Sequence, residues 1–469
     1  MAFASTYISR TFTAGDRTKF TLSVWLKRGR LTEGYEKIFQ GRDGSDSYDS
    51  SISFDPTDHI RMESWHNGSY TGGRLHTNRV FRDTSAWYHL VFIIDTANVT
   101  ADDRMQIWVN GVRETSFSTD VSATVDSEWY INKSGATNYI GCHSGTAGDA
   151  NCFTGEMSHM QFYDGYAYTA SDFGQTDSTS GIWTIKTSGP SSTYGTNGFF
   201  MKFEDKTNLD LDSSSNALTF TTTGTLTSTN DNPSNNFATF NPLYIATSTP
   251  PTFQNGNKVI VFSSTVGWRT IAATLGVSTG KWYWECIGGN SSGHLYNGVC
   301  SVEWLQNGDQ SSTGPCGETG YNLSQPSAGI YGVNGALTYS NTSGSGNTTG
   351  GYSATYVETD YISTYLDLDN HKLYFSKNGT IQNSGTGHDL PTGFTYLPCI
   401  SIYNSDAAGA GVNFGNGTFF STALTGTTYS DNDSIGTFKY SPNYGGASTF
   451  DGSAKNFMAL CTKNIKTYG

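Results

Sequence analysis

The sequence is short of charge and of long hydrophobic runs. Lys, Arg, Asp and Glu supply 14% of its 469 residues, well below the roughly 25% of an average soluble domain. No apolar run approaches the ~18 residues that a membrane-spanning helix needs. The 27 basic and 40 acidic residues give a net charge of −13, so the basic surface that binds nucleic-acid phosphates is missing. We therefore expect neither membrane insertion nor a nucleic-acid partner.

Cysteine is scarce as well. The seven cysteines are an odd number and include no Cys-x-x-Cys pair, which argues against a zinc ribbon and a complete disulfide framework. Cys142 and Cys152 can pair across a loop under oxidising conditions, and most of the cysteines are expected to fill small buried positions. The N-terminal residues lack the apolar segment of a secretory signal, which predicts a chain that is made in the cytoplasm or already processed.

Glycine, aromatic residues and small polar residues are abundant instead. The chain holds 54 glycines, and 14% of its residues are aromatic. Together with many Ser, Thr and Asn residues, these favour short strands joined by turns over helices. A domain usually spans about 150 residues, so the length predicts two or three domains. The expected fold class is all-β.

Strand signals begin early in the chain. Residues 20–27 (FTLSVWLK) alternate apolar and polar side chains, the period of a half-buried strand. Residues 87–95 (WYHLVFIID) form a continuous apolar run, which suits a central strand covered on both faces. Residues 104–117 contain the pair Asn110-Gly111, which supplies the positive φ angles of a tight hairpin turn.

Strand signals resume in the second half. Residues 281–287 (KWYWECI) and 299–304 (VCSVEW) predict two adjacent strands, and residues 360–379 predict a hairpin with its turn at Asp369-Asn370. The residues between Tyr321 and Tyr352 are rich in Tyr, Asn, Ser and Gly and predict a long loop.

These patterns divide the chain into four segments. We predict one sandwich of two antiparallel sheets in residues 1–186 and another in residues 252–425, because strands of this kind need two packed sheets to bury their apolar faces. Residues 187–251 are rich in Ser, Thr and Asn but contain Phe199 to Phe203, which is too apolar for a free linker. They are predicted to be an ordered bridge, and residues 426–469 a turn-rich tail that packs on the fold.

Four segments of the first block resemble, in order, the laminin-G-like domains of the concanavalin A lectin superfamily. They are FTLSVWLKRG (20–29), SAWYHLVFIIDT (85–96), DRMQIWVNGVRETSF (103–117) and GEMSHMQFYDG (155–165). The resemblance covers roughly residues 1–185 and implies a jelly roll of two antiparallel sheets.

The second block resembles a SPRY domain, which is another concanavalin-like sandwich. The matching pieces are STGKWYWEC (278–286), DYISTYLDLDNHKLYFSKNG (360–379) and YLPCISIYN (396–404) followed by GVNFG (411–415). The resemblance implies a protein-interaction module with no catalytic residues.

The bridge and the C-terminus resemble segments of structural proteins from tailed bacteriophages, especially marine ones. These segments are TYGTNGFFMKFED (193–205), LDLDSSSN (209–216), NNFATFNPL (235–243) and KNFMALCTKNI (455–465). The resemblance implies a component of a virion surface, made in the cytoplasm of a host bacterium and assembled with other virion proteins. Nothing in the sequence resembles the shaft of a long tail fibre.

Ligand contacts are predicted at two aromatic loops, because sugar rings have apolar faces and hydroxyl edges. In SWHNGSYTGG, the cluster Trp65, His66, Asn67 and Tyr70 combines aromatic rings with planar hydrogen-bonding groups. The alternative is a packed loop anchor. In the second block the candidates are Tyr321, Tyr331 and Tyr339, and a subunit or domain contact is the alternative there.

Metal sites are only weakly indicated. Asp210, Asp212, Ser214 and Asn216 follow a calcium-loop spacing, but Ser215 and Thr221 stand where the loop needs Gly and Glu, which favours a polar turn. The laminin-G-like resemblance implies that calcium can bind at the sandwich rim, where Asp43, Asp46 and Asp49 are the candidate ligands of a structural calcium ion. The alternative for these three residues is turn formation.

Three catalytic motifs are absent. The sequence has no ExDxxE carboxylate pattern of glycan-cleaving sandwiches, no HExxH and no phosphate-binding loop. Glu285 and Glu303 fall in strand patterns and are expected to be solvated or hydrogen-bonded. We therefore predict no catalytic residues and no cofactor, apart from the structural calcium ion considered above.

The sequence thus predicts a non-enzymatic structural and binding component of a tailed-phage virion, such as a head decoration, a knob or a short fibre. Its partners would be other virion proteins, further copies of itself in a trimer, and a host-surface glycan. The alternatives are a virion-associated polysaccharide depolymerase, a complete tail-fibre receptor-binding subunit and a secreted bacterial adhesin.

Overall fold

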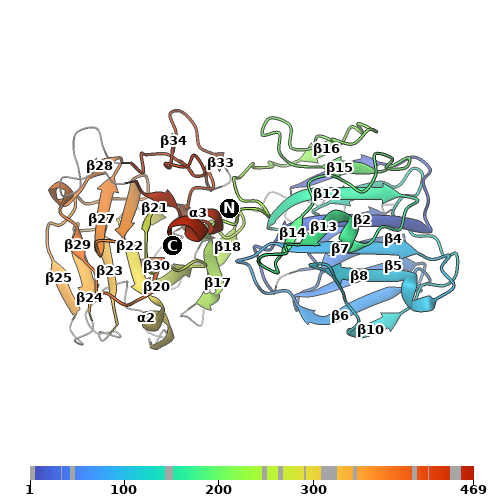
Figure 1. Cartoon of the computed structure of the whole chain (residues 1–469), viewed down its shortest axis with the longest axis horizontal. Helices are drawn as coiled ribbons and strands as arrows, with labels where there is room; N and C mark the ends of the chain where they lie inside the picture. Colours follow the sequence, from blue (N-terminus) through green and yellow to red (C-terminus); the bar gives the residue numbers. More distant parts are fainter. Residues whose placement is uncertain are drawn as a thin grey trace. The chain divides into compact units, whose positions relative to one another are not determined.

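The chain folds into two compact units, residues 1–228 and 229–469. The computed structural model describes residues 6–32, 34–42, 48–142, 151–245, 251–261, 268–289, 292–307, 325–341, 346–403, 409–420, 422–443 and 456–469. Both units consist of antiparallel sheets with a few short helices (Figure 1). The predicted all-β fold class, with two sandwiches of antiparallel sheets, is confirmed.

Unit 1 contains two main sheets, a larger and a smaller one. The larger sheet has the order β10 (Phe117–Val121), β6 (Arg74–Val80), β5 (His59–His66), β4 (Tyr48–Phe54), β3 (Lys37–Arg42), β11 (Thr137–Ile140), β1 (Tyr7–Thr11) and β16 (Thr221–Thr223). The smaller sheet has the order β15 (Phe199–Met201), β12 (Glu156–Asp164), β2 (Lys19–Lys27), β7 (Tyr88–Asp95), β8 (Met105–Val109) and β9 (Val112–Arg113). The inner faces of the two sheets bury one hydrophobic core, which includes Leu22, Phe39 and Phe92.

The outer face of the smaller sheet is covered by the chain itself. Helix α1 (Ala170–Phe173) and the hairpin β13 (Gly174–Thr176)–β14 (Trp183–Ile185) follow β12. Ala170 and Phe173 pack with Val91, Ile93 and Tyr163 in a second cluster. Strand β2, which lies between β7 and β12, is buried along both of its faces, so the expectation of a half-buried strand at residues 20–27 is wrong. The predicted Asn110-Gly111 hairpin is confirmed, with φ angles of 47° and 81°.

The predicted bridge, residues 187–251, is divided between the two units. In unit 1, β15 pairs with β12 and β16 pairs with β1. The buried Asp164 carboxylate fastens this part, because it accepts hydrogen bonds from the Asn197 amide N–H (3.0 Å) and from Asn132 Nδ2 (2.6 Å). In unit 2, the fully buried Phe237 and Ala238 belong to its hydrophobic clusters.

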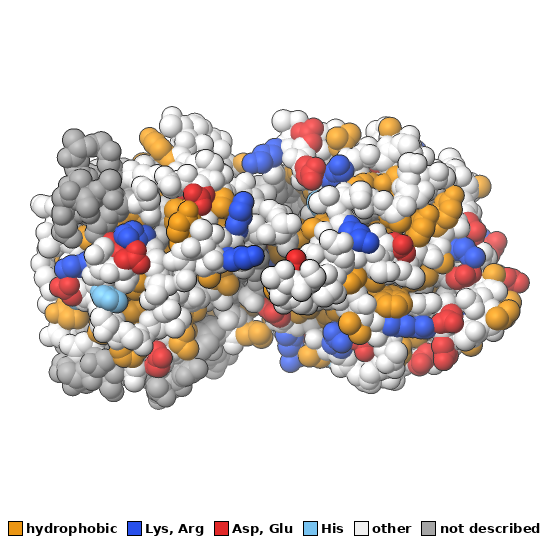
Figure 2. Space-filling view, viewed as in Figure 1, with side chains coloured by type: hydrophobic (Ala, Val, Ile, Leu, Met, Phe, Trp, Pro, Cys, Tyr) orange, Lys and Arg blue, Asp and Glu red, His pale blue; other side chains and the backbone are white. Residues whose placement is uncertain are grey.

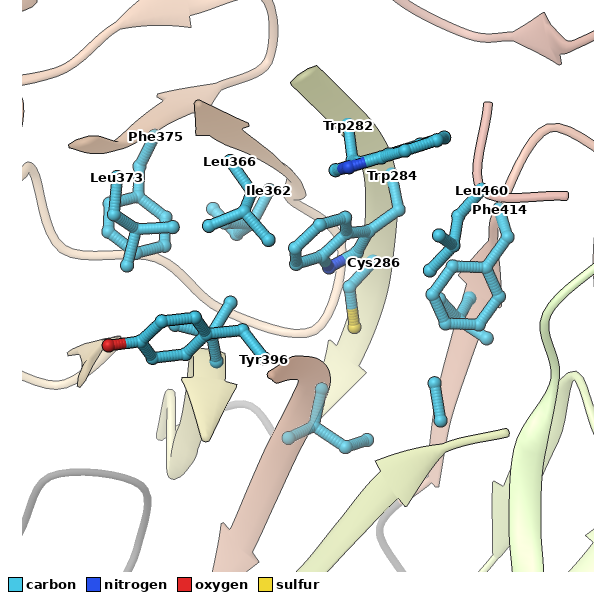
Figure 3. Packing of buried hydrophobic residues seen from close by; sticks show 14 of the residues in the cluster. Trp282, Trp284, Cys286, Ile362, Leu366, Leu373, Phe375, Tyr396, Phe414 and Leu460 are labelled. Carbon is cyan, nitrogen blue, oxygen red and sulfur yellow. The ribbon is translucent and has the colours of Figure 1, made fainter. Parts of the chain in front are cut away.

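Unit 2 is also built on two main sheets. The first has the order β17 (Phe240–Ile245), β20 (Trp268–Ala273), β30 (Tyr396–Tyr403), β22 (Leu295–Ser301), β23 (Ser327–Tyr331), β24 (Leu337–Ser340) and β25 (Gly346–Thr349). The second has the order β18 (Thr252–Gln254), β19 (Val259–Val261), β31 (Gly409–Asn413), β21 (Lys281–Gly289), β26 (Tyr361–Asp367), β27 (Lys372–Lys377) and β28 (Thr380–Ile381), with β29 (His388–Asp389) beside β27 and β36 (Met458–Ala459) beside β21. The core between these sheets contains Trp282 and Trp284 of β21, with Tyr396 of β30 contributed by the first sheet (Figure 3).

Two local predictions in unit 2 are wrong. The predicted strand 299–304 ends at Ser301, and Val302–Asn307 form helix α2, which buries Trp304 against the outer face of the first sheet. The predicted loop between Tyr321 and Tyr352 contains β23, β24 and β25 among its described residues. These strands are rich in Gly, Ser and Thr, so they lack the apolar alternation by which a strand is recognised.

The C-terminal residues cover the outer face of the second sheet. Phe438, Phe457 and Ala459 pack against Tyr283, Tyr365 and Tyr374, and all six are 0–1% exposed. The short elements of this region and of the turns are η1 (Ala101–Asp103), η2 (Asn383–Gly385), β32 (Thr418–Phe419), β33 (Thr422–Ala423), β34 (Tyr429–Ser430), β35 (Thr437–Phe438) and α3 (Thr462–Tyr468). Each helix in the described part of the chain is too short or too polar to span a bilayer.

Candidate functional site

A row of alternating aromatic, arginine and carboxylate side chains lies on the outer face of the larger sheet of unit 1. The Arg74 guanidinium lies over the Tyr70 ring, 4.8 Å from its centroid, and the Trp65 and Tyr70 rings meet edge to face at 4.8 Å. The Glu63 carboxylate pairs with Arg74 at 3.2 Å and with Arg61 at 2.7 Å. The Arg61 guanidinium lies over the Tyr35 ring at 4.8 Å. We call these six residues the arginine–aromatic row.

Strand alternation places the row on the outer face. Ile60 and Met62 of β5 are in the core, so Arg61, Glu63 and Trp65 point the other way. The register of β5 and β6 then sets Glu63 opposite Arg74. The turn after β5 makes this register possible, because Asn67 and Gly68 have φ angles of 42° and 94°.

The row remains partly exposed. The side chains of Arg61 and Glu63 are 12% and 13% exposed, that of Arg74 is 27% exposed, and Tyr35 is 41% exposed. Both arginines already hold a carboxylate and an aromatic ring, which fixes their planar groups in place. A ligand would therefore meet ordered ring faces and guanidinium edges.

The predicted cluster at residues 65–70 is split by the structure. Trp65 and Tyr70 lie in the row, whereas His66 is on the opposite side of β5 and bonds with Ser64 Oγ at 2.9 Å and with Thr71 Oγ1 at 3.1 Å. Burial lowers the pKa of His66, with Arg17 as a secondary cause, so the ring is neutral at pH 7. Asn67 lies in the turn after β5, where it adopts the positive φ angle that the turn needs.

Further polar side chains are buried beside the row. Lys37 of β3 donates a hydrogen bond from Nζ to Ser51 Oγ at 3.0 Å, and Ser51 lies opposite Glu63. Burial lowers the pKa of Lys37, and the nearby Asp49 and Glu63 only partly oppose this effect. Asp49 Oδ2 accepts a bond from Gln40 Nε2 at 2.8 Å. The buried side chains beside the row are thus polar, and hydrogen bonds among them already hold them in place.

The sequence prediction missed Tyr35, Arg61, Glu63 and Arg74. The pattern IRMESW at residues 60–65 does alternate, so it indicates that Arg61, Glu63 and Trp65 share a face. Their pairing with Arg74 depends on the cross-strand register, and the approach of Tyr35 depends on tertiary packing. Neither can be read from spacing alone.

The candidate tyrosines of unit 2 are also separated. Tyr331 lies on the outer face of the first sheet, because the preceding residue, Ile330, is in the core. Tyr339 packs toward that core and contacts the His388 ring at 4.4 Å. Tyr321 lies outside the described residues.

The calcium candidates show no metal site in the described part of the chain. Asp43 and Asp46 lie outside it, and no group of three or more His, Cys, Asp or Glu residues within it could hold a metal ion. Asp212 is buried and accepts backbone N–H bonds from Phe200, Ser214 and Leu218. The 210–216 segment is therefore a polar turn in this structure.

A serine and a histidine meet on the outer face of the smaller sheet of unit 1, but their roles do not suit catalysis. Trp183 donates from Nε1 to His89 Nδ1 at 2.9 Å, and His89 Nε2 lies 2.9 Å from Ser23 Oγ. Since Nδ1 accepts, the ring proton is on Nε2, which donates to Ser23. Burial lowers the pKa of His89 to about 3. His89 cannot take the Ser23 proton in this arrangement.

Glu285 is a buried carboxyl group in unit 2. It is 0% exposed, and its two oxygens accept bonds from the amide N–H of Lys439 (2.9 Å) and of Tyr440 (2.6 Å). Asn413 Nδ2 and Tyr283 Oη also donate to it. Burial raises the pKa of Glu285 to about 7, although these donors oppose the increase. The group fastens the C-terminal segment to β21. Glu303, the other glutamate noted in the sequence, lies on α2 and not on a strand.

The cysteines fall into two groups. Cys142 and Cys152 form a disulfide, and Cys399 is also disulfide-bonded. Cys286, Cys300 and Cys461 are free and buried, as expected for small apolar side chains. Burial raises the pKa of Cys286 to about 12, so its thiol is not a nucleophile at neutral pH.

Parts of this chain are similar to solved structures. No curated protein matches the sequence. The SPRY domain of human HERC1 matches at 16% identity with a TM-score of 0.28, covering 37% of this chain and 96% of that one. A heptameric SAP-like pentraxin from Limulus polyphemus matches at 19% identity with a TM-score of 0.26, covering 35% and 72%. A human SPRY domain matches at 12% identity with a TM-score of 0.24, covering 36% and 94%.

A family model covers most of the first unit. Residues 4–173 match the laminin-G-type family that is described as the concanavalin A-like lectin/glucanases superfamily. The matched segment begins before β1 and ends with α1, so it takes in most strands of both sheets and the whole arginine–aromatic row. Residues 4–173 are therefore similar to the concanavalin A-like lectin/glucanases superfamily, as the laminin-G-like motifs of this segment imply.

Proposed function

We propose that the chain is a non-enzymatic binding protein whose unit 1 holds a glycan on the arginine–aromatic row. The observation that carries this proposal is the row itself, in which the Trp65 and Tyr70 rings adjoin guanidinium and carboxylate groups that are fixed by ion pairs. Aromatic faces match the apolar faces of sugar rings, and planar charged groups match their hydroxyl edges. The similarity of residues 4–173 to the lectin/glucanases superfamily is consistent with a glycan ligand.

Arrays of immobilised glycans test the proposal. We expect the full-length chain to bind a subset of glycans, and the Tyr70→Ala variant to bind that subset at least tenfold more weakly, because it loses the ring that adjoins Trp65 and Arg74. The Arg113→Ala variant is the control, since Arg113 lies on β9 of the smaller sheet, pairs with Asp103 of η1 and is about as exposed as Arg74. Equal binding by the two variants would contradict a site at the row.

The absence of catalysis is a separate prediction. We expect no release of reducing sugar when the chain is incubated with each glycan that it binds, because the one carboxylate of the row, Glu63, is already paired with two arginines. Glycoside hydrolysis needs two carboxyl groups across the scissile bond. Release of reducing ends that a Glu63→Gln variant abolishes would favour the polysaccharide depolymerase instead.

The setting that we propose is the surface of a tailed-phage virion, where the chain would be a head decoration, a knob or a short fibre that contacts other virion proteins. The motifs of residues 193–216 and 455–465 support this setting, and a trimer stays a prediction. The viewed face in Figure 2 is mostly polar and uncharged, with charged side chains scattered over it. Antibody raised against the chain should label intact virions, and unlabelled virions would contradict the proposal.

A further inference from the structure

Five aromatic side chains meet at one end of the first sheet of unit 2. The cluster takes one residue from each of four adjacent strands, β20, β30, β22 and β23, and one from just before β22. Its members are Trp268, Tyr403, Tyr296, Tyr331 and His294. We call this group the aromatic cluster.

The register shows that the aromatic cluster faces outward. Trp268 lies opposite Tyr403, and Tyr296 lies opposite Tyr331. Ile402, Leu295 and Ile330, which immediately precede Tyr403, Tyr296 and Tyr331 in the chain, all belong to the core. Since side chains alternate along a strand, the aromatic rings project from the other side of the sheet.

The rings hold one another in a fixed arrangement. Tyr296 and Tyr331 stack with their centroids 4.4 Å apart and their planes at 4°. The Trp268 ring meets Tyr296 edge to face at 5.2 Å and lies 5.3 Å from Tyr403. His294 Nδ1 and Tyr331 Oη are 2.6 Å apart. A ligand would find these rings already ordered, which lowers the entropy cost of binding.

The aromatic cluster differs from a packing cluster in its exposure. On the outer face of the second sheet, Tyr283, Tyr365 and Tyr374 are 0–1% exposed under the C-terminal residues. In the aromatic cluster only Tyr296 is buried, at 5%, and the other four side chains are partly exposed. Packing alone does not require rings to remain accessible to water.

The aromatic cluster also differs from the arginine–aromatic row in charge. None of its members is Lys, Arg, Asp or Glu. Arg269 donates from Nη1 to the carbonyl oxygen of Trp268 at 2.8 Å, but its side chain projects from the core-facing side of β20. Three phenols, an indole and an imidazole offer ring faces and uncharged polar edges. This chemistry suits a ligand that has both apolar faces and hydroxyl groups but no charge.

We propose that the aromatic cluster is a second binding site, which takes a neutral sugar. The proposal is independent of the site in unit 1, because the residues that carry it belong to a different unit.

The experiment uses the full-length chain and an array of neutral gluco-, galacto- and manno-oligosaccharides. A Tyr70→Ala background removes the contribution of the arginine–aromatic row. In that background we expect neutral-glycan binding to persist, and an added Tyr331→Ala change to weaken it about tenfold, as the loss of one stacked ring predicts. The matched control is Tyr429→Ala, which removes an exposed tyrosine of β34 outside the aromatic cluster.

Circular dichroism establishes that each variant is folded, and Tyr403→Ala replaces Tyr331→Ala if the latter is not. The proposal is overturned if the Tyr70→Ala chain binds no neutral glycan, or if Tyr331→Ala and Tyr429→Ala bind equally. It is also overturned if the aromatic cluster binds proline-rich peptides on a peptide array and Tyr331→Ala abolishes that binding without affecting any glycan. If the arginine–aromatic row does not bind a glycan, the Tyr70→Ala chain will instead bind every glycan of the array as strongly as the wild type does.

Discussion

Replacing Arg28 by Met should lower the free energy of unfolding of unit 1 by about 3–5 kcal/mol, the usual cost of removing one partner from a buried ion pair. The Arg28 guanidinium donates to Glu36 Oε2 at 2.7 Å and to Asp58 Oδ1 at 2.8 Å. All three side chains are at most 2% exposed, and the guanidinium also lies over the Phe54 ring at 4.2 Å. The variant would leave two carboxylates buried without their shared cation.

Urea unfolding, monitored by circular dichroism, measures this loss in the free energy of unfolding. The control is Arg113→Met, which breaks an ion pair whose side chains are about one third exposed. Exposed pairs contribute at most about 1 kcal/mol, so the control should unfold close to the wild type. Similar midpoints for Arg28→Met and Arg113→Met would show that the buried network does not stabilise the sandwich as described.

The second large effect concerns pH and Glu285. Burial raises the pKa of this carboxyl group from 4.5 in the unfolded chain to about 7 in the folded chain. Its contribution to stability is therefore fully present below about pH 4.5 and is lost as the pH rises through about 7. A pKa difference of this size corresponds to about 3 kcal/mol.

A Glu285→Gln variant isolates this contribution, because glutamine does not ionise. The amide nitrogen of glutamine cannot accept a hydrogen bond, whereas a protonated carboxyl group keeps acceptor capacity on both oxygens for the two backbone N–H groups. The variant should therefore be less stable than the wild type at pH 5. The stability difference between the two proteins should then shrink by about 3 kcal/mol between pH 5 and pH 8. Unfolding measured across this range tests the prediction. A stability difference that stays constant or grows with pH would mean that the four hydrogen-bond donors, and not burial, determine the pKa of the Glu285 carboxyl group.

Local signals were sufficient to predict much of the sandwich architecture. The Asn110-Gly111 turn and the hairpin of residues 360–379 were predicted correctly, because each depends on residues that are close in the chain. Non-local packing explains the failures. Strand 20–27 is buried on both faces, and its outward-facing Thr21 bonds with the backbone of Tyr166 and Tyr168, which are distant in the chain. Strands β23 to β25 are held by their neighbours and not by an apolar pattern.

The candidate site was predictable only in part for the same reason. Trp65 and Tyr70 are near neighbours in the chain, so their proximity could be inferred from the turn between them. The ion pairs of Glu63 depend on a cross-strand register with Arg74, and the aromatic cluster of unit 2 joins residues as far apart as Trp268 and Tyr403. Such contacts follow from the order of strands in a sheet, which the spacing of residues does not reveal.

The central claim is that the arginine–aromatic row of unit 1 binds a glycan. Titration calorimetry with the glycan that binds best on the array tests it most directly, using the wild type, Arg74→Ala and the matched control Arg113→Ala. The account predicts that Arg74→Ala weakens binding at least tenfold while Arg113→Ala binds like the wild type. Unchanged affinity in Arg74→Ala, with the fold intact, would contradict it.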